Sequence, residues 1–106
     1  MASLDIQEGP APGRQFGLGP RSVMIGRDES CTITIQDERV SRRHLQIVYD
    51  RRRDRHFVVD VGSSNGVLVN GVRIERGTER VLEDGDEIRI GHSRLRYDTE
   101  PGSVSR

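Results

Sequence analysis

The sequence predicts an all-β fold, a two-sheet antiparallel β-sandwich of about eleven strands, and three observations support this prediction. Val and Ile, which favour strands, supply 19 of the hydrophobic residues, whereas Ala, the best helix former, occurs only twice. Twelve glycines and four prolines divide the chain into pieces too short for long helices. Short segments that alternate apolar and polar residues recur between these breaks, as half-buried strands do.

The N-terminal half contains the first five expected strands. They are centred on residues 4–6, 16–18, 23–25, 31–35 and 45–49. A turn of glycines and prolines over residues 9–13 separates the first two, and Gly26 ends the third. The alternation over residues 31–35 is regular, so Cys31 is expected to be a strand residue.

The C-terminal half contains the other six expected strands. They cover residues 57–61, 67–69, 72–74, 81–82, 88–90 and 95–97. The charged turn 50–55 connects the fifth strand to the sixth. Asn70-Gly71, between two short apolar segments, is the strongest short-range signal for a β-hairpin.

The size and the cysteine content limit the class of protein. A chain of 106 residues has room for one domain. No apolar run approaches the ~18 residues of a membrane helix, and the start of the chain lacks a signal peptide, so we expect a cytoplasmic domain that does not bind membranes. The single cysteine, Cys31, excludes an internal disulfide framework. The three histidines are scattered and have no cysteine pair beside them, so neither a metal nor a cofactor is expected.

The charges balance, because 17 acidic residues face 17 basic residues and every basic residue is arginine. A net charge of zero argues against non-specific nucleic-acid binding as the main task, since that task requires an excess of positive charge. A local basic cluster remains compatible with this balance.

Three loops carry residue types that can hold a phosphate group. They are residues 26–28, 40–44 and 62–66. Arginine donates charge-assisted hydrogen bonds, serine adds a short donor, and glycine lets the backbone approach a ligand closely. These loops therefore predict an anion-binding surface.

The same loops resemble those of the forkhead-associated (FHA) domain, which reads phosphothreonine peptides. The resemblance is carried by four motifs in order: Gly26-Arg27, Ser41-Arg42-Arg43-His44, Ser64-Asn65-Gly66 and Asn70-Gly71. It covers residues 3–98, which we expect to form an FHA domain with an FHA/SMAD-like sandwich. Residues 99–106 are expected to be a disordered C-terminal tail.

The resemblance implies a role for each matching binding residue. Arg27 and Ser41 match the positions that bind the phosphate, and Arg42 matches a neighbouring position that often adds a contact. Ser64 matches the residue that lines the phosphothreonine pocket. Asn65 matches the asparagine that hydrogen-bonds the peptide backbone.

The resemblance also implies supporting residues. His44 matches a histidine that holds the binding loop from beneath, and Asn70 matches an asparagine that stabilises a loop. Val67 departs from the pattern, because many members carry threonine there, and we expect only a small change in loop rigidity. The glycines that accompany the motifs are Gly26, Gly66 and Gly71.

We therefore expect a non-enzymatic module that binds a protein phosphorylated on threonine, with a Ser/Thr kinase among the candidate partners. Ser41 and His44 could suggest a nucleophile and a base, but the sequence supplies no orienting acid or oxyanion hole for them. One alternative is a docking module of the same fold with an unphosphorylated partner. A second is a nucleic-acid accessory domain that uses Arg51–Arg55, although Asp54 and the preceding Asp50 interrupt this basic patch.

Overall fold

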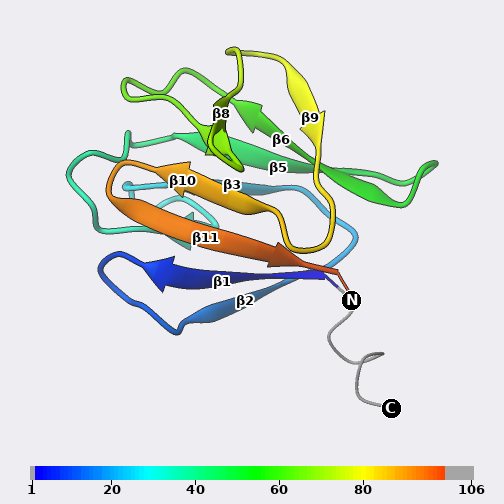
Figure 1. Ribbon diagram of the computed structural model, residues 1–106, viewed down its shortest axis with the longest axis horizontal. Helices are drawn as coiled ribbons and strands as arrows, with labels where there is room; N and C mark the ends of the chain where they lie inside the picture. The colour runs from blue at the N-terminus through cyan, green and yellow to red at the C-terminus, as the bar shows by residue number, and fades with distance from the viewer. Residues whose placement is uncertain (1, 100–106) are drawn as a thin grey trace.

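The structure, a computed structural model, describes residues 2–99 and contains eleven strands in two facing sheets (Figure 1). The strands are β1 (Ala2–Glu8), β2 (Gln15–Leu18), β3 (Val23–Gly26), β4 (Ile33–Thr34), β5 (Leu45–Asp50), β6 (Arg55–Asp60), β7 (Leu68–Val69), β8 (Val72–Arg73), β9 (Glu79–Val81), β10 (Glu87–Ile90) and β11 (Ser93–Asp98). The first sheet has the order β2-β1-β11-β10-β7-β8, and the second has the order β4-β3-β5-β6-β9. The predicted β-sandwich is confirmed.

The core lies between the sheets and is built from the inward-facing residues of most strands. Leu4, Ile88 and Leu95 of the first sheet are at most 1 % exposed, and so are Ile25 and Leu45 of the second. Each such side chain stabilises the fold by roughly 1.5–3 kcal/mol relative to an exposed position. The packed side chains therefore hold the two sheets together, and the loops lie at the ends of the sandwich.

The strand pairs of both sheets are antiparallel except at one strand. β4 runs parallel to β3, with Ile25 opposite Ile33. The predicted strand 31–35 also shrinks to two residues, and Cys31 lies outside it. The reason is local, because the Cys31 N–H closes a turn onto the Asp28 carbonyl at 3.0 Å instead of pairing with a strand.

The Asn70-Gly71 hairpin is confirmed. Both residues have positive φ angles, 52° and 83°, as the tight turn between β7 and β8 requires. Gly71 adopts this conformation readily, and asparagine tolerates it better than most other residues.

Thr99 is the last residue that the structure describes. The N–H of Thr99 donates to Asp84 Oδ1 at 2.9 Å, and the rest of the predicted tail, residues 100–106, lies outside the described residues. Across residues 2–99 no helix is long and apolar enough to cross a membrane.

The loops form two clusters at opposite ends of the sandwich, as Figure 1 shows. The loops after β3, before β5 and after β6 lie together at the left of the view. The β5–β6 hairpin, residues 50–55, projects at the right. All three loops of the predicted phosphate site thus share one end, and the alternative basic patch lies at the other.

Candidate functional site

Arg27 follows β3 and is held in place through its own guanidinium. Its Nε–H donates to the Val40 carbonyl at 2.9 Å, and its backbone N–H donates to the Ser41 carbonyl at 3.0 Å. The side chain is exposed, and within residues 2–99 its two Nη groups make no hydrogen bond. Arg27 therefore presents an oriented pair of donors to solvent, which suits an anion.

Gly26 permits the close approach that places Arg27. A Cβ at Gly26 would stand 2.0 Å from the Arg42 carbonyl oxygen, far inside any real contact. That carbonyl also accepts the Asp28 N–H at 3.2 Å, so the loop after β3 lies directly against the loop before β5. Arg42 itself is exposed beside this contact.

Ser41 and Ser64 join two loops that are far apart in sequence. The Ser64 N–H donates to Ser41 Oγ at 3.0 Å. Because the Ser41 hydroxyl accepts this bond, its own proton is available to an anion. The Ser64 hydroxyl is exposed on the same surface and makes no hydrogen bond within the described part of the chain.

His44 lies beneath both loops and is completely buried. Its Nδ1 accepts the Ser41 N–H at 2.9 Å, and its Nε2 lies 2.8 Å from the Gly66 carbonyl oxygen. These two partners require a neutral ring with its proton on Nε2. Burial is the main cause that lowers the pKa of His44, partly opposed by the hydrogen bond to Gly66, and the lowered pKa favours the same neutral form. His44 thus bonds the loop before β5 to the loop after β6.

The loop after β6 has a support that the sequence reasoning missed. Asp60 accepts the N–H groups of Gly62 and Ser63 at 2.9 and 2.8 Å, and the Ser63 hydroxyl at 2.8 Å. Ser63 Oγ in turn accepts the Gly66 N–H at 3.0 Å. Burial would raise the pKa of Asp60, but the hydrogen bonds from Ser63 and Gly62 outweigh it and lower the pKa. An aspartate two or three residues before Gly-Ser is an Asx-turn signal that could have indicated this role.

Asn65 is exposed and reaches across to the loop before β5. Its Nδ2 donates to the Arg39 carbonyl at 2.8 Å, while its Oδ1 makes no hydrogen bond within residues 2–99. The amide therefore has one acceptor and one further N–H available, the pair of groups that an extended peptide backbone can use.

Asn70 and Gly71 lie outside this cluster of loops. Asn70 Nδ2 donates to Asp86 Oδ1 at 2.9 Å, and Asn70 Oδ1 accepts the Glu87 N–H at 2.9 Å. Asn70 thus joins the β7–β8 turn to the start of β10. The β7–β8 turn that these bonds hold carries neither Ser41 nor Ser64.

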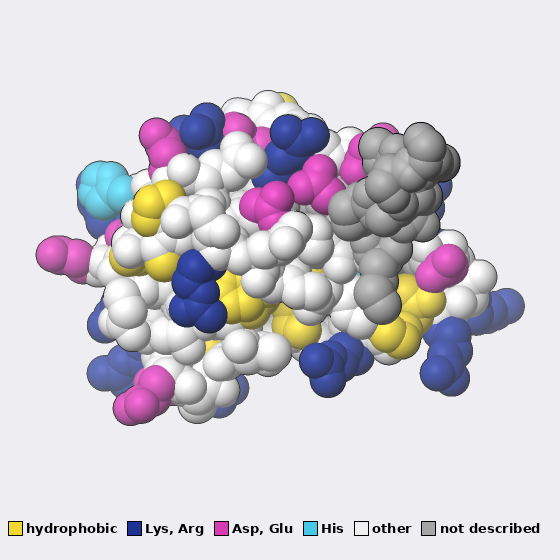
Figure 2. Space-filling model, turned by 90° about the horizontal axis from the view of Figure 1, so that it is seen from below, with side chains coloured by type: hydrophobic (Ala, Val, Ile, Leu, Met, Phe, Trp, Pro, Cys, Tyr) yellow, Lys and Arg dark blue, Asp and Glu magenta, His cyan; other side chains and the backbone are white. Residues whose placement is uncertain are grey.

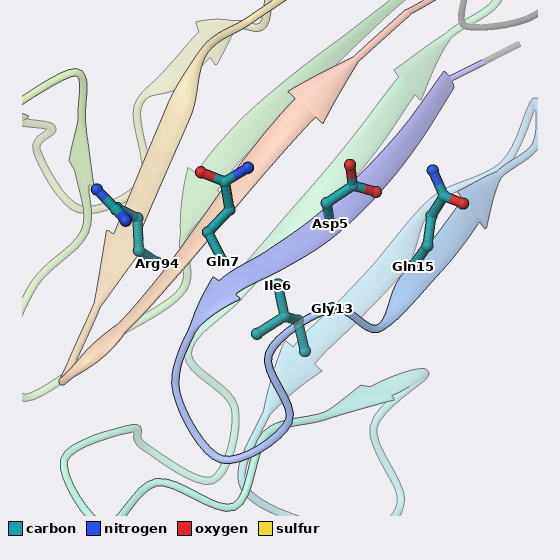
Figure 3. A pocket seen from close by; sticks show the side chains of 6 residues that line it. All are labelled: Asp5, Ile6, Gln7, Gly13, Gln15 and Arg94. Carbon is teal, nitrogen blue, oxygen red and sulfur yellow. The ribbon is translucent and has the colours of Figure 1, made fainter.

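A shallow, open hollow lies elsewhere on the molecule. It has a volume of about 530 Å³ and lies on the outer face of β1, β2 and β11, lined by Asp5, Gln7, Gln15 and Arg94 among others (Figure 3). None of the predicted site residues lines it. The candidate site is instead formed by the exposed residues of three adjoining loops. Within residues 2–99 no three His, Cys, Asp or Glu side chains gather into a metal site.

Comparison with known proteins identifies the family. The model of the FHA domain matches residues 23–91, more than half of the chain. The oxoglutarate dehydrogenase inhibitor of Corynebacterium jeikeium is 42 % identical over 94 residues, which cover 89 % of this chain and 62 % of the relative. The chain spans about six-tenths of the length of this relative and of the oxoglutarate dehydrogenase inhibitor of Corynebacterium diphtheriae.

Two solved structures are similar over nearly the whole fold. One, from work on phosphothreonine-dependent FHA domain interactions, has a TM-score of 0.81 and 35 % identity, and the match covers 94 % of this chain and 97 % of that one. The other is the FHA domain of FhaA complexed with the intracellular domain of Rv3910, with a TM-score of 0.79 and 35 % identity over 92 % of this chain and 99 % of that one. The motifs, the sandwich and these matches agree, and the chain belongs to the FHA domain family.

Proposed function

We propose that this domain binds phosphothreonine-containing segments of proteins phosphorylated by a Ser/Thr kinase. It acts as a cytoplasmic binding module without catalysis or cofactor, and the kinase itself is one candidate partner. The phosphate lies against Arg27 and the Ser41 hydroxyl, with Arg42 beside them. Ser64 lines the threonine side chain, and Asn65 bonds the peptide backbone.

One observation carries this proposal above the others. The Arg27 guanidinium is anchored through Nε at 2.9 Å from the Val40 carbonyl, so its Nη donors are oriented before any ligand arrives. A pre-oriented arginine loses less side-chain entropy on binding than a freely moving one. A phosphate dianion can accept several such charge-assisted bonds at once.

The docking alternative uses the same loops without a phosphate. It gives no reason for a buried histidine to hold Ser41 in a position where its hydroxyl proton is free for an anion.

The nucleic-acid alternative uses Arg51–Arg55. There Asp50 accepts the N–H groups of Arg52 and Arg53 and pairs with Arg53 at 3.5 Å, so part of the positive charge is neutralised locally.

Binding to an oriented peptide library with a constant phosphothreonine tests the proposal, beside the same library carrying threonine. We expect retention of phosphorylated members only, and a short DNA duplex should bind weakly, with an affinity that salt abolishes. Equal retention of both libraries would favour the docking module. Retention of the duplex alone would favour the nucleic-acid alternative.

A further inference from the structure

The turn formed by residues 37–40 offers two consecutive backbone carbonyls to the candidate site. The Arg39 carbonyl accepts Asn65 Nδ2 at 2.8 Å, and the Val40 carbonyl accepts Arg27 Nε at 2.9 Å. The two side chains that we assign to the peptide backbone and to the phosphate therefore take their orientation from one short turn. A shift of this turn would move both of them together.

The Asp37 side chain holds that turn. Asp37 is 7 % exposed, and its Oδ1 accepts the Arg39 N–H at 2.9 Å. The Asp37 carbonyl accepts the Val40 N–H at 2.9 Å, which closes the turn. The residues that supply both orienting carbonyls are thus bonded to Asp37.

The same carboxylate ties the turn to a distant strand connection. Asp37 Oδ2 accepts the His92 N–H at 2.8 Å, from the turn after β10, and the hydroxyl of Ser93, the first residue of β11, at 2.7 Å. Gly91 packs against this contact, since a Cβ there would stand 3.0 Å from Arg39 Cβ and 3.1 Å from Asp37 Oδ2. The turn 37–40 is therefore braced against the opposite sheet.

We propose that Asp37 is a positioning residue for phosphopeptide binding, which acts through the Arg39 and Val40 carbonyls to orient Asn65 and Arg27. This inference rests on the proposed function of the loop surface. It predicts that Asp37, which does not contact the phosphopeptide, controls the affinity of the domain for the peptide through two residues that do contact it. Burial alone would raise the pKa of Asp37, but the hydrogen bonds from Ser93, Arg39 and His92 outweigh it and lower the pKa, so the acceptor is ionised at neutral pH.

The test is Asp37→Asn, which keeps the shape of the side chain but replaces one acceptor oxygen by an NH₂ donor facing N–H or O–H donors. The matched control is Asp86→Asn. Asp86 is 8 % exposed and also accepts three bonds, from Asn70, Arg80 and the Glu83 N–H, but in the β9–β10 turn away from the site. Thermal unfolding should show a similar loss of stability for both variants.

Two readouts separate positioning from stability. With a phosphothreonine peptide selected from the library, Asp37→Asn should lose about tenfold in affinity, the effect of one ordinary hydrogen bond, and Asp86→Asn less than twofold. Without peptide, the NMR resonances of Arg27 Nε–H and of the Asn65 side-chain amide should shift in Asp37→Asn and stay in place in Asp86→Asn.

A double-mutant cycle gives the sharpest form of the test. If Asp37 acts partly through Asn65, the double variant with Asn65→Ala should lose less affinity than the product of the two single losses. Wild-type affinity in Asp37→Asn, or full additivity in the cycle, would overturn the inference and leave the proposed function intact. If no phosphopeptide binds the wild type, the proposed function fails, and unshifted resonances in Asp37→Asn would separately overturn the positioning role.

A milder variant covers the case in which Asp37→Asn does not fold. Ser93→Ala removes one of the bonds to the Asp37 carboxylate and leaves the carboxylate itself. It should move the same two resonances in the same direction by a smaller amount. Unchanged resonances together with unchanged affinity in folded Ser93→Ala would count against the inference.

Discussion

The two ends of this sandwich both carry arginines beside serine or aspartate, yet they organise them differently. At the loop end, Arg27 is anchored by the carbonyl of a neighbouring loop. At the hairpin end, Arg53 pairs with Asp50 at 3.5 Å with 67 % of its side chain exposed. Arg52 is exposed too, and within the described residues its side chain makes no hydrogen bond.

The difference shows that anchoring, more than the number of charges, distinguishes a candidate binding site from a solvated surface. Figure 2 shows one face of the molecule, on which basic and acidic side chains are interspersed, with basic ones at the right-hand end where the β5–β6 hairpin lies. Both ends carry several exposed arginines, Arg27, Arg42 and Arg43 at the loop end and Arg51–Arg53 at the hairpin. The exposed ion pair of the hairpin is worth little and costs side-chain entropy to form.

The largest expected effect is a loss of folding stability on replacing either of the two buried histidines, His44 at the loop end and His56 at the hairpin end. His44→Ala should lower the free energy of unfolding by about 2–4 kcal/mol, because it leaves a cavity and two unpaired backbone groups. His56 is similarly buried and contacts the Tyr97 hydroxyl at 2.9 Å and the Gly19 carbonyl at 3.2 Å, so His56→Ala should cost a similar amount.

Only one of these two variants should affect binding. At a temperature where both are folded, His44→Ala should also lose phosphopeptide affinity, whereas His56→Ala should retain it. Chemical denaturation and calorimetric titration measure the two quantities. Equal affinities in the two variants would show that His44 supports the fold and not the site.

The next effect compares two exposed arginines. Arg27→Ala should weaken phosphopeptide binding about tenfold to 150-fold, since a charge-assisted hydrogen bond contributes about 1.5–3 kcal/mol. Arg52→Ala removes the same charge at the hairpin end and should change the affinity less than twofold. Arg27→Lys should also weaken binding, because lysine keeps the charge and loses the fork of donors. Calorimetric titration measures these affinities. If Arg52→Ala lost as much phosphopeptide affinity as Arg27→Ala, the two ends of the sandwich would not differ in binding.

A smaller effect concerns pH. Burial lowers the pKa of His44 from its ordinary 6.5, so the unfolded chain takes up a proton at a pH where the native protein does not. The stability is therefore complete above about pH 6.5 and falls as the pH drops through that value towards the native pKa. Asp37, Asp60 and Asp86 have pKa values below 3.8 and do not affect this range. Denaturation at several pH values measures the slope, and an unchanged slope in His44→Gln would contradict this assignment.

The smallest effect concerns the threonine methyl group beside Ser64. Burying it contributes on the order of 0.8 kcal/mol, which is about fourfold in affinity for phosphothreonine over phosphoserine. Matched peptides that differ only in this methyl group measure the preference by fluorescence anisotropy. Equal affinities would mean that Ser64 does not line the side chain.

The sequence predicts the parts of this molecule that depend on local pattern. The eleven strands follow from the alternation of apolar and polar residues. The β7–β8 turn follows from Asn70-Gly71, because asparagine and glycine are the residue types that most readily adopt positive φ angles. The candidate binding residues also lie on adjoining loops, although their roles in binding remain predictions.

Other features depend on partners far away in the chain or on backbone atoms, which residue types do not reveal. The Asp37 carboxylate accepts a hydrogen bond from the Ser93 hydroxyl, 56 positions away in the sequence, and no local sequence pattern predicts that bond. The Arg39 and Val40 carbonyls would serve equally well from other residues. The strand that alternation predicts over residues 31–35 is shortened because Cys31 closes a turn with Asp28, and alternation does not indicate that β4 pairs parallel to β3.

The most direct test of the account is a map of backbone amide shifts by NMR during titration with a phosphothreonine peptide and with its unphosphorylated twin. The account predicts the largest shifts at Arg27, Ser41, Ser64 and Asn65 with the phosphorylated peptide only, and none at residues 51–53 of the β5–β6 hairpin. Shifts centred on the hairpin, or the same pattern with both peptides, would contradict the claim that the anchored loop end reads the phosphate.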